Sequence, residues 1–392
     1  MEEINVFKRN YIVYFYGYFV IELIGIVVNA YIPVYFLNIL SIPKEEVAIV
    51  LLFASLILII KPIVSIVFDK KPKQTRTIAM IGSLSLIITY ALLLFTLESL
   101  ILFGIFLSFS FALIALVDSA IDKYIVAASP TEKIKNNNVI WTRLGSSIGT
   151  GVGALTFIMI SSWNLYFILS ILLTIPLLFI ILLLKKLRAT ETNKIYNIKD
   201  LLPKLKSKPI ILMCLFFILY SANYLYDWVM EPWVMSTYGS GGFNLFNIFL
   251  IIWLTFYILG YILGRALQEK ISYKSGIILP MIIIGTFFII GPYLDLVIFL
   301  LLMTIGQLLA GIVSVNVMSF VVDLSKKKAV LFQFMYSFII IMKIIFTPLG
   351  LMLYTVLPGE TIITIAGCLF VACVVPIYFI KFEKKRYLNN LS

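Results

Sequence analysis

Long apolar runs, separated by short polar segments, extend along nearly the whole chain. A helix needs about 20 predominantly apolar residues to cross the roughly 30 Å hydrocarbon core of a bilayer. The pattern predicts twelve such helices, six before and six after one longer polar segment. The predicted spans are 11–38, 46–68, 77–97, 99–127, 138–161 and 163–184, followed by 209–238, 243–264, 274–294, 296–322, 329–356 and 361–381.

The one long hydrophilic segment, residues 185–208, is rich in Lys and Arg. Four of its apolar residues recur at helical spacing: Ile198, Leu201, Leu202 and Leu205. This pattern fits an amphipathic helix on an anionic membrane surface or a solvated linker equally well. We therefore predict an N-terminal six-helix bundle over 1–184, a basic cytoplasmic linker, and a C-terminal six-helix bundle over 209–392.

Composition excludes a soluble protein, because 62% of the residues are hydrophobic and only 13% are charged. Soluble domains have roughly 45–50% and about 25%. The net charge of +12 arises mainly from Lys and Arg in the loops that an inside N-terminus makes cytoplasmic. By the positive-inside rule, both termini are expected in the cytoplasm. The basic charge thus reflects membrane topology, and no nucleic-acid partner is expected.

Several kinds of chemistry lack their usual residues. The chain has no histidine, and its three cysteines lie apart in apolar runs, so we expect neither a metal site nor a disulfide framework. No Gly-x-x-x-x-Gly-Lys-(Ser/Thr) phosphate loop occurs, which argues against ATP hydrolysis by this chain. No cofactor is expected. The first apolar run has no small-residue cleavage site before or within it, so we expect a retained helix rather than a signal peptide.

The two halves repeat the placement of their charged loops. SIVFDKKPKQTR (65–76) follows span 2, and GRALQEKISYKSG (264–276) follows span 8, about 199 residues later. Two six-helix halves with a basic cytoplasmic linker resemble the major facilitator superfamily of transporters. That family's loop after span 2 reads Gly-x-x-x-Asp-(Arg/Lys)-x-Gly-x-(Arg/Lys)-(Arg/Lys). Asp69 and Lys70 match this motif, Lys73 and Arg76 supply the trailing charge, and Ser65 and Pro72 replace the two glycines.

A second, local resemblance lies in spans 4 and 5. The segments VDSAIDKY (117–124) and NNNVIWTRLGSSIG (136–149) are similar to the muropeptide permease and acetyl-CoA transporter branch. The superfamily resemblance implies alternating access around a central cavity. Spans 1, 4, 7 and 10 would line that cavity, with contributions from spans 2, 5, 8 and 11.

Ionisable groups at membrane depth are costly unless paired or wetted, so each is a candidate functional residue. Nine lie in the predicted spans: Glu22, Lys61, Asp118, Asp122, Lys123, Arg143, Asp227, Glu231 and Lys343. Glu22 and Lys343 are near mid-depth. Asn29 shares the helix face of Glu22, and Tyr336 shares that of Lys343. We predict that they bind substrate or protons; a structural ion pair between the halves is the alternative.

Four of these groups and Asp69 fall at the predicted cytoplasmic end. Asp118 and Asp122 are four residues apart on one helix face, so a nearby cation should pair with them. Arg143 is the first candidate partner and Lys61 the second. We predict an inner gate made of these five residues, with plain stabilisation of the N-terminal bundle as the alternative. Lys123 is expected to extend to the inner surface.

The outer third of span 7 carries two further acids, Asp227 and Glu231, beside Trp228. Pro232 removes a backbone hydrogen bond, so we expect the helix to bend or unwind there. This stretch suits an outer gate or a ligand contact, although aromatic residues also favour the membrane interface for its own sake. Gln307 begins a polar stripe on span 10 that is predicted to face substrate.

Glycines at 145, 149 and 153, and at 260 and 264, predict close helix packing. Together these features indicate an all-α plasma-membrane protein that transports a small organic solute by alternating access, as a monomer in the bilayer and with protons as a candidate coupling ion. A membrane-embedded glycosyl- or lipid-transferase is one alternative, because Lys44, Glu45 and Glu46 place acidic charge in the first external loop. A non-transporting scaffold or sensor is the other.

Overall fold

The computed structural model describes residues 2–26, 36, 42–96, 98–127, 132–160, 163–182, 202–227, 229–268, 270–325 and 328–380. Some side chains in these ranges, Glu231 among them, are not described. Every regular element in the described ranges is helical. Most of the predicted linker, 185–208, falls outside them, apart from the four-residue helix α9 (Leu202–Leu205).

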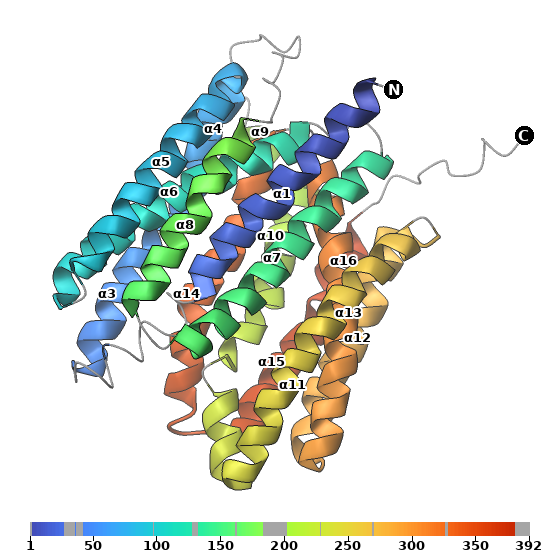
Figure 1. The fold of residues 1–392 in the computed structure, drawn as a ribbon. Coiled ribbons are helices and arrows are strands. Elements are labelled where there is room, and N and C mark those ends of the chain that lie inside the picture. Colours follow the sequence, from blue (N-terminus) through green and yellow to red (C-terminus); the bar gives the residue numbers. More distant parts are fainter. Residues whose placement is uncertain are drawn as a thin grey trace, which may run out of the picture.

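The N-terminal half contains helices that overlap the predicted spans, although α1 begins before predicted span 11–38 and the end of that span lies outside the described residues. They are α1 (Glu2–Ile26), α3 (Lys44–Leu56) with η3 (Ile57–Ile60) and α4 (Lys61–Lys70), η4 (Pro72–Gln74) with α5 (Thr75–Leu94), α6 (Leu100–Ala127), α7 (Glu132–Ile160) and α8 (Trp163–Ile181). The helices run side by side and obliquely through the bundle (Figure 1).

The C-terminal half repeats this arrangement. It contains α10 (Lys208–Tyr220) with η6 (Ser221–Leu225), α11 (Met230–Gln268), α12 (Tyr273–Ile290) with η7 (Gly291–Tyr293), α13 (Leu296–Leu324), α14 (Ala329–Leu353), α15 (Gly359–Ala372) and α16 (Val374–Phe379). Within the described residues, nine helices are long and apolar enough to cross a membrane. We call the end of the bundle where α1 begins and α4 ends the inner end, after the predicted topology.

The outer surface of the bundle is apolar, whereas soluble proteins rarely expose large contiguous apolar areas. Large hydrophobic side chains such as Phe53, Ile63, Ile101 and Met352 are each more than 60% exposed. With no water in the bilayer core, a helix is the element that satisfies its own backbone hydrogen bonds. The exposed apolar belt and the all-helical backbone therefore have the same cause, and both agree with a multi-pass membrane protein.

The same pairs of helices pack together in each half. In the N-terminal half α1 packs on α7, α6 on α3 and α4, and α5 on both α6 and α8. In the C-terminal half α10 and η6 pack on α14, α13 on α11, and α12 on both α13 and α15. The two bundles are thus related element by element, although their exact boundaries, at 184 and 209, stay a prediction.

Two seams join the halves. Along one, α14 packs against α4 and α6, and along the other, α7 packs against α11 and α13. Each seam pairs the second helix of one half with the fifth of the other. A relative rocking of the halves would have to break or slide these two seams.

Span 7 is interrupted, but not where the sequence predicted. Its helix ends at Tyr220, continues as the 3₁₀ segment η6 to Leu225, and resumes as α11 at Met230. Pro232 lies in the first turn of α11, where its missing N–H costs no helical hydrogen bond. The bending or unwinding expected at Pro232 therefore lies a few residues before it, between Ser221 and Met230. A second break, at Gly239 with φ of 66°, separates spans 7 and 8.

The glycine face of α7 packs against the backbone of α1, as predicted. A Cβ atom on Gly145 would lie 2.1 Å from the carbonyl oxygen of Phe15, and one on Gly149 would lie 2.3 Å from that of Phe19. Because the opposing atoms are backbone, they cannot move aside without separating the two helices. Gly151, on the same helix, instead faces the flexible end of the Leu254 side chain.

We expect Gly145→Ala to lower the apparent melting temperature of the detergent-solubilised protein, because overpacking against fixed atoms costs about 1–3 kcal/mol. Gly151→Ala is the matched control, since Leu254 can change rotamer, and it should melt close to the parent. Thermal unfolding followed by intrinsic fluorescence checks both. Equal melting of the two variants would contradict the tight α1–α7 contact.

Candidate functional site

Asp69, in the last turn of α4, forms the innermost charge contact. The Lys123 ammonium lies 2.5 Å from its Oδ1, and both side chains are almost fully buried. Lys123 had been expected to extend to the inner surface. That expectation is wrong, because Asp69 provides a buried partner on the neighbouring helix.

Asp69 also reaches across the seam to the other half of the protein. The backbone N–H of Ala329 donates to its Oδ1 at 3.1 Å, and the N–H of Val330 donates to its Oδ2 at 3.0 Å. These N–H groups belong to the first turn of α14, where a helix carries partial positive charge. The carboxylate thus stabilises the start of a helix that belongs to the opposite bundle.

Asp122 makes a second connection between the halves, one helical turn deeper. The Tyr18 hydroxyl of α1 donates to its Oδ1 at 2.5 Å, and the Gln333 amide of α14 donates to its Oδ2. Asp122 is 2% exposed. One buried carboxylate therefore holds α1, α6 and α14 together.

Asp118 pairs with Lys61, the first residue of α4. Lys61 was the second of the two expected partners; Arg143, the first, makes no close ion pair among the described residues. The side chains of Lys61 and Asp118 are 14% and 7% exposed. Asp118 Oδ1, the other carboxylate oxygen, is buried without a hydrogen-bond partner in the described part of the chain.

Arg143, on α7, instead reaches across the centre to α14 of the other half. Its guanidinium donates to the Tyr336 hydroxyl at 2.8 Å and lies 5.8 Å from the centre of that ring. Nearby on the second seam, the hydroxyls of Ser147 and Tyr261 are 2.9 Å apart. The hydrogen bonds that join the halves thus lie at the inner end and near mid-depth.

Glu22 and Lys343 face the same central region from opposite halves. Glu22 is partly buried and lies within electrostatic range of Lys343, Asp118, Lys61 and Arg143. Lys343 Nζ lies 5.4 Å from the centre of the Tyr224 ring. A ligand between the halves would meet charges of both signs together with an aromatic surface.

Of the remaining predicted site residues, only Asp227 and Gln307 have described side chains. Asp227 is exposed in the turn between η6 and α11 and lies within electrostatic range of Lys343. Asn29 and Trp228 fall outside the described residues. For Glu231 only the backbone, in the first turn of α11, is described.

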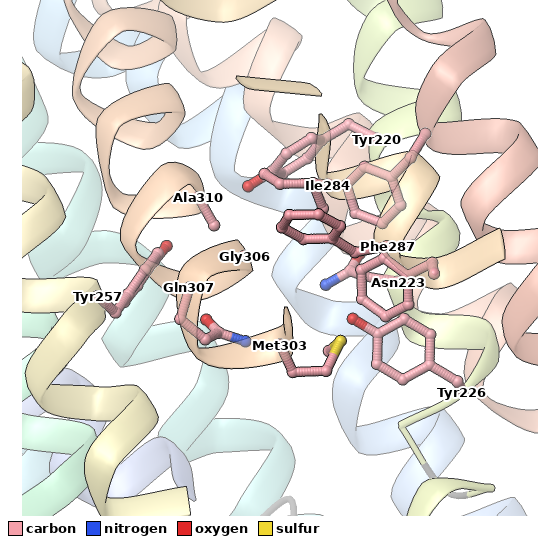
Figure 2. A pocket seen from close by; sticks show the side chains of 12 residues that line it. Tyr220, Asn223, Tyr226, Tyr257, Ile284, Phe287, Met303, Gly306, Gln307 and Ala310 are labelled. Atoms are coloured by element: carbon pink, nitrogen blue, oxygen red, sulfur yellow. The ribbon is translucent and has the colours of Figure 1, made fainter. Parts of the chain in front are cut away.

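Gln307 lies on α13 at a pocket of about 110 Å³ inside the C-terminal bundle (Figure 2). Its walls are mainly aromatic: Tyr220, Tyr226, Tyr257, Phe287, Phe288 and Phe370. Asn223 of η6 lies on the other side of the space from Gln307, so two amide groups face it. No charged residue is among the described residues that line this pocket.

Sequence reasoning missed several of these partners. Gln333 stands three residues before Tyr336 and ten before Lys343, so the polar face of α14 was readable from helical spacing. Tyr18 precedes Glu22 by one turn, but nothing in the sequence places it against Asp122. The tyrosines around the pocket look like ordinary apolar positions in the sequence, because the pocket forms only where six separate elements meet.

Comparison with known proteins bears on the fold. No family model and no curated protein sequence matches the chain. Solved structures do match: the Escherichia coli fucose:proton symporter FucP has TM-score 0.72 and 13% identity, covering 96% of this chain and 98% of that one. A structure of the proton:xylose symporter XylE has TM-score 0.72 and 11% identity, covering 96% and 95%.

A bacterial homologue of the iron transporter ferroportin, in an outward-facing state, has TM-score 0.76 and 11% identity, covering 94% of this chain and 98% of that one. FucP in the outward conformation, described as a major facilitator superfamily transporter, has TM-score 0.75. At such low identity these likenesses establish the fold alone. They confirm the predicted all-α membrane fold of this superfamily.

Removing one member of the Lys61–Asp118 pair should destabilise the protein strongly. Asp118→Leu leaves a buried ammonium without its partner, a change that costs about 3–5 kcal/mol. The double variant Lys61→Met, Asp118→Leu should recover most of this loss, because two apolar side chains replace the pair. Melting in detergent measures both, with exposed Lys270→Met as control; a double variant no more stable than Asp118→Leu would refute the pairing.

Replacing Asp69 should open the inner end. Asp69→Asn removes the charge that meets α14 and Lys123, and we expect the open-to-closed ratio to rise about tenfold. Spin labels at positions 71 and 270, in a cysteine-free background, report the separation of the two halves. Asp295→Asn is the matched control, since Asp295 caps its own helix α13 through Val297. An unchanged distance distribution in Asp69→Asn would contradict the expectation.

Proposed function

We propose that this protein is a secondary transporter that moves a small organic solute by alternating access, with protons as the coupling ion. The observation that carries the proposal is the set of contacts between the N-terminal charge cluster and α14. Asp69, Asp122 and Arg143 belong to three different helices of one half, and each bonds to this one helix of the other half.

These contacts are of a kind that can break and re-form. Each is a side-chain hydrogen bond between helices that are already complete, so separating the seam leaves the backbone of both bundles intact. With the seam formed at the inner end, a central ligand would have access from the outer side. Opening would require new partners for the released carboxylates, and water entering from the inner side would supply them.

Carboxylates are the proposed proton carriers, because the chain has no histidine. Glu22 is central and close to cations from both halves. Asp118 has one oxygen already paired with Lys61 and one without a partner. A proton taken up by either group would cancel a charge that a neighbouring cation depends on, and this would couple protonation to the seam.

An organic solute is favoured over a metal cation. In the described part of the chain, no group of three or more His, Cys, Asp or Glu residues could hold a metal ion, and the central acids face lysine and arginine. Two of the similar structures are proton symporters of the sugars fucose and xylose, which supports proton-coupled solute transport. Because a homologue of an iron transporter is also structurally similar, metal transport is the alternative that the experiment tests.

The plasma membrane, cytoplasmic termini and a monomeric state complete the proposal, and they rest on the distribution of Lys and Arg and on the helix count. The likeness of spans 4 and 5 to the muropeptide permease and acetyl-CoA transporter branch stays a sequence prediction. The proposed substrate class does not depend on it.

Uptake into proteoliposomes tests the proposal. The panel contains monosaccharides, amino acids, organic acids and Fe²⁺, each with and without an inward proton gradient. We expect gradient-stimulated uptake of an organic solute, lost in Glu22→Gln because the amide cannot carry a proton. Glu98→Gln is the matched control, since Glu98 is exposed in the turn between α5 and α6.

Flux of Fe²⁺ alone would refute the substrate class. Uptake of a solute that is indifferent to the gradient and to Glu22→Gln would refute proton coupling. Absence of flux for every compound, from protein that is monodisperse and melts normally, would refute transport.

A further inference from the structure

We propose that the pocket inside the C-terminal bundle binds an uncharged, hydroxyl-bearing ring of the size of a monosaccharide. This deepens the proposed function, because the ring would be part of the transported solute. The pocket lies between α10, η6, α11, α12, α13 and α15, and its described lining residues belong to the C-terminal half.

Gly306 shows that the space is not a packing accident. Most described helical glycines lie against fixed or bulky neighbours: a Cβ on Gly260 would lie 2.1 Å from Leu308 O, and one on Gly350 would lie 1.8 Å from Leu225 O. At Gly306 the nearest atom is Phe287 Cδ2, at 3.9 Å. Gly306 lies in the middle of α13, where glycine weakens a helix relative to alanine. Its missing side chain serves the cavity rather than a close helix contact.

The polar groups of the pocket are placed by the break in span 7. Non-helical backbone at membrane depth is tolerated where it lines a cavity, and η6 with the turn after it brings Asn223 and Tyr226 to the pocket wall. Asn223 Oδ1 is buried without a hydrogen-bond partner among the described residues. Figure 2 shows the Asn223 and Gln307 amides and the Tyr226 hydroxyl directed toward the same space.

Size and lining together define the ligand class. The pocket of about 110 Å³ is comparable to the ~150 Å³ engineered cavity that holds a benzene ring. Aromatic walls such as Phe287 and Tyr257 offer flat surfaces to the faces of a ring. Two amides and several tyrosine hydroxyls offer both donors and acceptors, and no charged residue lines the pocket to compensate a charged ring. A ring with hydroxyl groups at its edge satisfies all three conditions.

The pocket also borders the central charge cluster. Tyr220 lies within electrostatic range of Tyr224, Arg143 and Tyr336, so its wall reaches the region that Glu22 and Lys343 face. The C-terminal half would then hold the ring, and the N-terminal half would carry the titratable acids. Binding of the ring would not itself require the acids.

The test is equilibrium binding of radiolabelled D-glucose, D-xylose and L-fucose to the purified full-length protein in detergent. Gly306→Leu places a side chain in the pocket, and leucine favours a helix more than glycine does. We expect this variant to weaken binding at least tenfold. Gly306→Ala is its matched control, because a Cβ has room there, and binding should stay within about threefold of the parent. Gln307→Leu should weaken binding about tenfold by leaving ligand hydroxyls unpaired.

A second pair of variants removes single hydroxyls. Tyr226→Phe should weaken binding, whereas Tyr293→Phe should not, because Tyr293 is 64% exposed and is not among the lining residues of the pocket. Melting curves verify that each variant is folded. Benzyl alcohol, a ring of similar size without hydroxyl groups on the ring, is added as competitor and should displace the sugar poorly.

Unchanged sugar binding in Gly306→Leu, or no binding of any of the three sugars to the parent, would overturn the proposal. Benzyl alcohol competing as well as unlabelled sugar would overturn the hydroxyl-bearing class. If the parent transports a solute and Gly306→Leu transports it equally well, the proposed function would stand and this subsite would be refuted. If the parent binds sugar, Gly306→Leu loses that binding and no solute is transported, the subsite would stand and the proposed transport function would be refuted.

Discussion

A carboxylate or ammonium group inside an apolar bundle is costly unless an opposite charge or a hydrogen bond meets it. In this protein the ion pairs Lys61–Asp118 and Lys123–Asp69 meet part of the requirement within the N-terminal half, and hydrogen bonds across the boundary between the halves meet the rest. Asp69 meets the first N–H groups of α14, Asp122 meets the Gln333 amide, and Arg143 meets the Tyr336 hydroxyl. The N-terminal bundle therefore depends on α14 of the other bundle for some of the partners of its buried charges. Any movement that separates them at the inner end must first provide those charges with other partners.

The two seams meet this requirement with different chemistry. Gln268 stands 199 residues after Asp69, which is the spacing of the repeated charged loops, and it ends α11 as Asp69 nearly ends α4. Gln268 donates to Val315 O and Ser319 Oγ, and Ser319 in turn donates to Asn136 on α7 at 3.4 Å. One seam is thus ionic and the other neutral. A change of protonation would directly weaken the α4–α14 seam but not the α7–α11 seam. The two seams are therefore equivalent in the repeated fold but differ in their response to pH.

The sequence was sufficient for the helices and insufficient for their partners. Span limits such as those of α5 and α13 follow from the length of hydrocarbon to be crossed, which a local run of residues records directly. The pairing of Lys61 rather than Arg143 with Asp118 depends on which helices become neighbours, and no local pattern records that. The break in span 7 was assigned to Pro232 because proline is the usual local cause of a bend. The sequence could not distinguish Gly306 from a glycine in a close helix contact, since the two differ only in whether a neighbouring helix or a cavity faces them.

One face of α14 carries most of the residues through which this helix contacts the charged groups of the other half. Ala329, Gln333, Tyr336 and Lys343 follow one another by intervals of four, three and seven residues, so they lie along a single face of the helix. The first three bond to Asp69, Asp122 and Arg143, and the fourth lies near Glu22 at mid-depth. Helix α14 also packs on η6, the irregular segment that carries Asn223 to the pocket, and Lys343 lies over the ring of Tyr224 in that segment. A shift of this one helix would alter the acids of one half and the pocket of the other together, which is the physical link that coupled transport needs.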